Sequence, residues 1–257
     1  MRKCKLTGLE GDFVKSHLLP RTLTRLSRTG EKTTELGPGR QRPIRRTEGW
    51  YDTQLVISNG EKILERYDTH GIAELRRLGL VWSSAYNSNL VRVDFESEKG
   101  QRFVHIRSEH PKRLRMFVLS LLWRAASTKI EVFSHFSISE SDREYLRSLL
   151  LSDNTGLESE FPTVFVATCG PGAVHNHTPV RQELEIEEGV KVDYSRFYLD
   201  GLIVHVCDRN CSRSYAANAQ TALVGFNREF DVVVVPFFDS RQKSDLVDVM
   251  TSAGMIY

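Results

Sequence analysis

The clearest hydrophobic patterns in the chain are helical. From Pro111 onward, apolar residues at helical spacing form one stripe that predicts a buried helix: Leu114, Phe117, Val118, Leu121, Leu122 and Ala125. A second helix is predicted over residues 139–151, because its Ser-Glu-Ser-Asp opening is typical of a helix N-terminus. The same spacing predicts a helix over residues 61–78, in which Gly71 weakens the pattern and could divide the helix in two.

Strand-like patterns dominate the last hundred residues. Short runs rich in β-branched and aromatic residues predict strands over residues 163–167, 183–186, 196–199, 202–207, 222–226 and 232–235. Asp200-Gly201 predicts a tight turn between two of them. A further strand pair is predicted over residues 90–95 and 103–106, with Lys99-Gly100 at its turn.

The N-terminal part alternates short elements with a long polar stretch. A turn at Cys4 is followed by a short apolar strand that ends at His17, and a β-rich run over residues 50–57 leads into the helix that contains Glu61. Between these strands, residues 26–49 are rich in glycine, proline and charge and predict a loop.

Together these patterns predict an α+β protein. We expect an N-terminal ββα-finger-like segment, a helical middle and a mainly antiparallel β C-terminal region. The corresponding domains are a ββα segment over residues 1–80, a strand pair with a helical core over 81–155, and a β-rich domain over 156–257.

Composition limits the class of protein more than its function. The chain has 257 residues, 40% hydrophobic and 26% charged, which is ordinary for a globular protein. Its four cysteines are scattered, which favours reduced thiols, and no apolar run approaches the ~18 residues that span a membrane. We therefore expect a cytoplasmic protein with no membrane partner.

Local charge points to a polyanion more clearly than the net charge of +2 does. Residues 21–46 carry two acidic residues and these basic ones: Arg21, Arg25, Arg28, Lys32, Arg40, Arg42, Arg45 and Arg46. Such a segment attracts phosphate through counterion release, but it is equally typical of a solvated loop.

Residues 4–61 resemble the HNH, or His-Me finger, nuclease superfamily. In its zinc-bearing members, a Cys-x-x-Cys precedes a strand ending in Asp-His or a similar pair, and a later segment reads Asn-x-x-x-x-Cys-x-x-Cys-His. Here residues 4–7 read Cys-Lys-Leu-Thr and residues 16–20 read Ser-His-Leu-Leu-Pro. Asp52 stands at the position of the family's Asn, and Glu61 stands at its final His.

The chain departs from this pattern at the zinc ligands. Thr7, Ile57 and Gly60 replace three of the four zinc-binding cysteines, so only Cys4 remains and we expect no structural zinc. Ser16 stands where many members have a metal-binding carboxylate or histidine. Packing would have to replace the folding energy that the zinc contributes.

The resemblance implies a metal-dependent site that hydrolyses DNA. His17 would be the general base, since imidazole can accept a proton from water near neutral pH. Asp52 and Glu61 would offer oxygen ligands to Mg²⁺ or Mn²⁺. The residues expected to contact nucleic acid are Arg40, Arg42, Arg45 and Arg46, and the last two could bind the scissile phosphate.

Alternatives remain open at this point. His17 could instead be a capping or core histidine. The scaffold could be catalytically inactive and bind nucleic acid or protein, with a protein partner at the C-terminal β region. His175 and His177 would share one face of a strand, and His205 in a neighbouring strand could complete a zinc site. The simpler interpretation is that these histidines form hydrogen bonds near the turn before Pro179.

Overall fold

The fold is seen in a computed structural model that describes residues 2–23, 33–36, 44–46, 49–84, 93–98, 100–169, 175–187, 189–209 and 219–252. Its helices are α1 (Ser58–Arg77), α2 (Pro111–Ser127), α3 (Glu140–Ser152) and α5 (Arg241–Ser252). Short 3-10 helices are η1 (Arg21–Leu23), η2 (Trp82–Ser84), η4 (Glu131–Phe133), η5 (Gln220–Ala222) and η6 (Phe237–Asp239). The predicted α+β class is confirmed.

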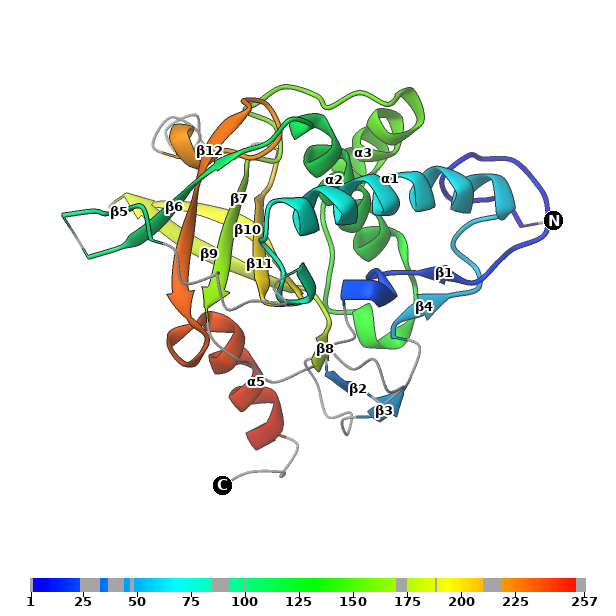
Figure 1. The fold of residues 1–257 in the computed structure, drawn as a ribbon. Coiled ribbons are helices and arrows are strands. Elements are labelled where there is room, and N and C mark those ends of the chain that lie inside the picture. The colour runs from blue at the N-terminus through cyan, green and yellow to red at the C-terminus, as the bar shows by residue number, and fades with distance from the viewer. Residues whose placement is uncertain are drawn as a thin grey trace.

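Helix α2 is the central element of the core. Thirteen of its 17 residues are buried, because α1 and α3 lie along it and a large sheet covers its remaining side (Figure 1). A helix that is buried nearly all round needs apolar residues beyond a single stripe. The sequence supplies them in the run from Met116 to Trp123, so the predicted core role of this helix is confirmed.

Helices α1 and α2 approach closely at Gly71. A Cβ atom at this position would lie 2.3 Å from the Cβ of Phe117, which is closer than real atoms approach. Helix α1 is continuous through Gly71, so the predicted division into two pieces is wrong. The glycine that weakens the helical pattern is what allows the two helices to pack.

The large sheet has seven strands in the order β5-β6-β12-β7-β11-β10-β9. All neighbours are antiparallel except β12 and β7. The strands are β5 (Phe95–Glu96), β6 (Arg102–Arg107), β7 (Thr163–Cys169), β9 (Val180–Glu187), β10 (Val190–Leu199), β11 (Leu202–Cys207) and β12 (Glu229–Pro236). The mainly antiparallel C-terminal region is therefore confirmed, and β6 from the predicted middle domain joins the same sheet.

Two small sheets complete the fold. One pairs β1 (Ser16–His17) with β4 (Tyr51–Asp52), and the other has the order β3-β2-β8, formed by β2 (Thr33–Leu36), β3 (Ile44–Arg46) and β8 (His175–His177). The prediction of a loop over residues 26–49 is thus wrong for β2 and β3. Strand β2 pairs with β3 and with the distant β8.

Other local predictions need correction. The predicted strand over residues 50–57 is reduced to β4, and Ile57 forms only an isolated bridge with Phe13. The predicted strand over residues 222–226 is absent, and its first residue, Ala222, is the last residue of η5. Helix α5 was not predicted. Its Asp245 carboxylate binds Arg196 Nη1 of β10 at 3.0 Å and so ties this helix to the sheet.

One hydrophobic cluster runs through the described chain from Cys4 to Val232. It includes buried residues from each of the three predicted domains, whose boundaries stay a prediction. None of the helices in the described part of the chain combines the length and apolar character needed to cross a membrane.

We predict that Gly71→Ala destabilises the protein by about 2 kcal/mol, because overpacking against Phe117 outweighs the gain of about 1 kcal/mol in helix propensity. Urea unfolding measures the change. The exposed Thr69→Ala on the same helix is the control and should change stability little. In a double-mutant cycle, Phe117→Leu should be less costly in the Gly71→Ala background than alone. Additive effects would contradict the proposed contact.

Candidate functional site

Strands β1 and β4 and the start of α1 form one corner of the molecule. The two strands pair antiparallel, with Ser16 opposite Asp52 and His17 opposite Tyr51. The chain then turns into α1, which carries Glu61 in its first turn. The order strand, strand, helix is the one that the sequence predicts, and Figure 1 shows the helix beside the strand pair.

The four positions at which the sequence resemblance places zinc ligands lie around one sulfur atom. Cys4 is buried, and its Sγ accepts a hydrogen bond from the Thr7 N–H at 3.4 Å. A Cβ atom at Gly60 would lie 3.0 Å from the same sulfur. Burial raises the pKa of the Cys4 thiol, but hydrogen bonds from Thr7 and from the backbone of Ile57 and Leu6 lower it by more.

His17 is held by its backbone and lies beside an aromatic ring. Its carbonyl accepts a hydrogen bond from Arg124 Nη1 at 2.8 Å. Its imidazole meets the ring of Tyr51 edge-on, with centroids 6.3 Å apart, and the Lys15 ammonium sits 4.1 Å from the centre of the same ring. The side chain is half-buried, and its Nε2 is shielded from solvent.

Glu61 is a partly desolvated acid. Burial raises the pKa of its carboxyl group above the ordinary value, and the nearby Asp68 and Glu65 carboxylates act in the same direction. The Ser16 hydroxyl and the Arg124 guanidinium partly offset this rise. Glu61 Oε2 and Ser16 Oγ are both buried and complete no hydrogen bond of good geometry, although the hydroxyl lies beside the carboxylate.

Asp52 has a different role from Glu61. Its Oδ1 accepts a hydrogen bond from the Gln54 N–H at 2.6 Å, and its Oδ2 accepts one from the Thr128 hydroxyl at 2.7 Å. Both oxygens of this buried carboxylate therefore hold the turn after β4 and fix it to the end of α2. Each oxygen keeps a second lone pair, so the use of Asp52 as a metal ligand stays a prediction.

The side chains at this corner do not make a complete metal site. Within the described ranges, no group of three or more His, Cys, Asp or Glu residues is arranged to hold a metal ion. Glu61 offers one unpartnered oxygen, with Ser16 beside it. Mg²⁺ in proteins often relies on one or two carboxylates and takes its other ligands from water and substrate phosphates. Glu61 could thus anchor such an ion, but the protein alone does not enclose it.

A basic cavity of about 430 Å³ adjoins the strand pair. Tyr51 and Asp52 form part of its wall, and four basic residues line it: Arg2, Lys3, Lys5 and Lys129. Lys5 Nζ donates to the Ser127 carbonyl at 2.6 Å, and burial lowers its pKa while Asp52 counteracts this. Sequence analysis did not single out these residues. The basic N-terminus was a visible signal, whereas Lys129 joins it only through the fold.

The predicted nucleic-acid contacts are only partly placed. Arg40 and Arg42 lie outside the described residues. Arg45 and Arg46 belong to β3, where they pair with Thr34 and Thr33 of β2. The structure thus places their backbone in the small sheet β3-β2-β8.

The secondary histidine set is not on neighbouring strands. His175 and His177 are in β8, which pairs with β2, whereas His205 is in β11 of the large sheet, so the predicted adjacency is wrong. Burial and the nearby charge of Arg196 together lower the pKa of His205 to about 3. Arg196 Nε donates to His205 Nε2 at 3.3 Å, so this nitrogen is already occupied by a protein donor.

Comparison of the chain with protein-family models, with curated proteins and with solved structures finds no match.

We predict that Glu61→Gln stabilises the protein at pH 7.5. The folded state binds the Glu61 proton more tightly than the unfolded state, so stability falls as pH rises from the ordinary glutamate pKa to the raised one. The amide removes this loss. Urea unfolding at pH 4 and pH 7.5 should show the gain only at the higher pH. The exposed Glu65→Gln is the control, and an equal gain there would contradict the burial argument.

Proposed function

We propose that the protein is a metal-dependent HNH-like endonuclease that acts on DNA. One observation carries the proposal: residues 4, 7, 57 and 60 surround one sulfur atom, and Ser16, which precedes His17 in β1, lies beside Glu61. These positions are far apart in sequence. Their convergence is what the resemblance to the HNH superfamily requires, although three of the zinc ligands are replaced.

Each residue at the corner has a proposed task. His17 accepts a proton from the attacking water, and its cross-strand neighbour Tyr51 fixes the orientation of the ring. Glu61 anchors the cation, which when bound would neutralise charge on the phosphate and leaving group. Asp52 keeps β4 in place through Gln54 and Thr128. The basic cavity holds the phosphate backbone beside this corner.

A second function, DNA binding without hydrolysis, is favoured by two other observations. The Nε2 atom of His17 is shielded from solvent, and both oxygens of Asp52 are engaged in hydrogen bonds. The basic cavity does not depend on either group. However, catalytic geometry in a ligand-free site often tightens only with substrate, so these observations do not exclude hydrolysis.

A plasmid assay with Mg²⁺ or Mn²⁺ separates the two functions. We expect the protein to nick supercoiled DNA, and His17→Ala to lower the rate at least about 100-fold, because general base catalysis contributes that much or more. His105→Ala, an exposed histidine on β6, should leave the rate unchanged. Cleavage that survives His17→Ala would reject His17 as the base. The second function holds if the protein binds duplex DNA without cleaving it. Lys129→Gln should then lower the number of counterions released on binding, read from the salt dependence of the affinity, by about one.

Restoring the zinc ligands tests the resemblance itself. We predict that the combined variant Thr7→Cys, Ile57→Cys and Gly60→Cys binds one Zn²⁺ or Co²⁺ per chain, because the three new sulfurs would surround Cys4. Thiolate-to-cobalt absorption bands report tetrahedral binding, and circular dichroism reports any metal-dependent folding. Adding Cys4→Ala should weaken binding strongly. Absence of the cobalt bands in the combined variant would contradict the proposed relationship.

A further inference from the structure

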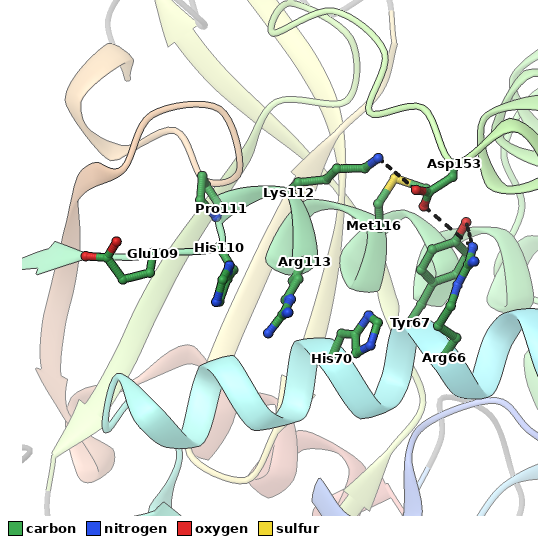
Figure 2. Close-up of a pocket in the computed structure, with 10 residues that line it drawn as sticks. All are labelled: Arg66, Tyr67, His70, Glu109, His110, Pro111, Lys112, Arg113, Met116 and Asp153. Atoms are coloured by element: carbon green, nitrogen blue, oxygen red, sulfur yellow. Dashed lines mark hydrogen bonds and ion pairs between the residues drawn. The ribbon is translucent and has the colours of Figure 1, made fainter.

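A groove of about 380 Å³ lies between α1 and the beginning of α2, away from the β1–β4 corner (Figure 2). Its size is within the range of small-ligand sites in proteins. Along α1, Glu61 and Asp68 are seven residues apart and fall on one flank. His70 is nine residues beyond Glu61, which at about 100° per residue places it on the opposite flank. The groove is therefore separate from the candidate nuclease site.

Basic and imidazole side chains outnumber the acidic ones in this groove. Five of them line it, namely Arg66, His70, His110, Lys112 and Arg113, against the two carboxylates Glu109 and Asp153. Both carboxylates are already neutralised. Asp153 binds Lys112 at 2.8 Å and Arg66 at 3.6 Å, and Glu109 lies 3.7 Å from Arg107 and 3.8 Å from Arg228.

Three side chains in the groove are left over after this pairing. The side chains of Arg113, His70 and His110 make no hydrogen bond or ion pair with any other residue that the structure describes. Figure 2 shows Arg113 reaching from α2 towards the part of the groove where His70 rises from α1. Arg113 is half-buried, so its guanidinium is partly removed from water without gaining a protein partner. An anion in the groove would replace the interactions with water that the guanidinium loses on burial.

The start of α2 adds to the positive potential. The first turn of this helix has no acidic residue, and the side chain of His110 does not cap it. The helix dipole therefore favours negative charge at the same end of the groove. This contribution adds to the positive potential that the unpaired basic side chains already create.

We propose that this groove binds a phosphate group, held by the fork of the Arg113 guanidinium and by N–H donors of His70 and His110. A planar guanidinium matches the oxygens of a phosphate in bidentate geometry, and two imidazoles supply further donors from either side. The phosphate belongs to a free phosphorylated small molecule or to a nucleic-acid strand, and both present the same oxyanion. The proposal does not depend on hydrolysis at His17.

The test is titration with two defined probes, inorganic pyrophosphate and an eight-nucleotide single-stranded DNA, followed through the Cε1–H NMR signals of the eight histidines. His70→Gln and His110→Gln assign the two relevant signals. We expect these signals to shift saturably, and Arg113→Gln to weaken binding about 10-fold, the loss of one charge-assisted contact. Arg113→Lys keeps the charge but not the forked guanidinium. Its affinity should fall between those of the unmodified protein and Arg113→Gln.

Arg241→Gln is the matched control, because it removes the same charge from an exposed residue in the first turn of another helix, α5. It should change affinity less than two-fold. Tighter binding of pyrophosphate identifies a small-molecule site, and tighter, salt-dependent binding of the oligonucleotide identifies a strand path. The proposal is overturned if no saturable shift appears below about 10 mM probe, if chloride at equal ionic strength shifts the signals equally, or if a folded Arg113→Gln binds like the unmodified protein.

Discussion

The buried guanidinium of Arg124 joins the elements on which the candidate site depends. Only 1% of its side chain is exposed, yet it binds the Asp68 carboxylate of α1, the Ser120 hydroxyl of its own helix and the His17 carbonyl of β1. A buried charge is tolerated only when such partners surround it, and removing one partner of a buried pair typically costs 3–5 kcal/mol. The position of His17 relative to α1 and the α2 core is therefore fixed by one side chain near the end of α2.

Arg124 also helps the corner keep its shape with one cysteine at the four positions where the zinc-bearing HNH pattern has ligands. A structural zinc contributes folding energy directly. Here apolar side chains from the same segment, such as Leu6, Leu18, Leu55 and Val56, belong to the main hydrophobic cluster that surrounds α2. Packing against the helices and the Arg124 hydrogen bonds therefore hold the N-terminal segment in place.

The sequence predicted those parts of the fold in which a local pattern and the tertiary environment agree. Helix α2, the N-cap of α3 at Ser139 and most strands of the large sheet are such cases, since apolar spacing or a capping residue specifies them directly. The prediction failed where a contact with a residue far along the chain determines the local structure. In sequence, Gly71 indicates a break in the helix, whereas in the fold it makes room for Phe117. Strand β2 forms by pairing with β8, about 140 residues later in the chain.

The candidate site shows the same limit. Spacing identified Glu61, but the engagement of Asp52 with Thr128 and the approach of Lys129 to the N-terminal lysines are invisible in sequence because they depend on how α2 ends. No local pattern could have predicted that one of two similar carboxylates would be structural and the other partly desolvated. That difference arises from which oxygens find hydrogen-bond donors in the folded chain.

The electrostatics of the corner constrain any phosphate chemistry there. Glu61 is an acid beside the proposed path of a phosphodiester, and two negative groups in a partly desolvated place repel each other. A phosphate can approach only if a cation lies between them or if Glu61 takes up a proton, and its raised pKa makes the second route easier than for an exposed glutamate. Lysines in the adjacent cavity attract the backbone, but Asp52 already offsets part of the charge of Lys5. The placement of one carboxylate thus makes phosphate binding at this corner depend on a cation or a proton, whether the bound strand is cut or only held.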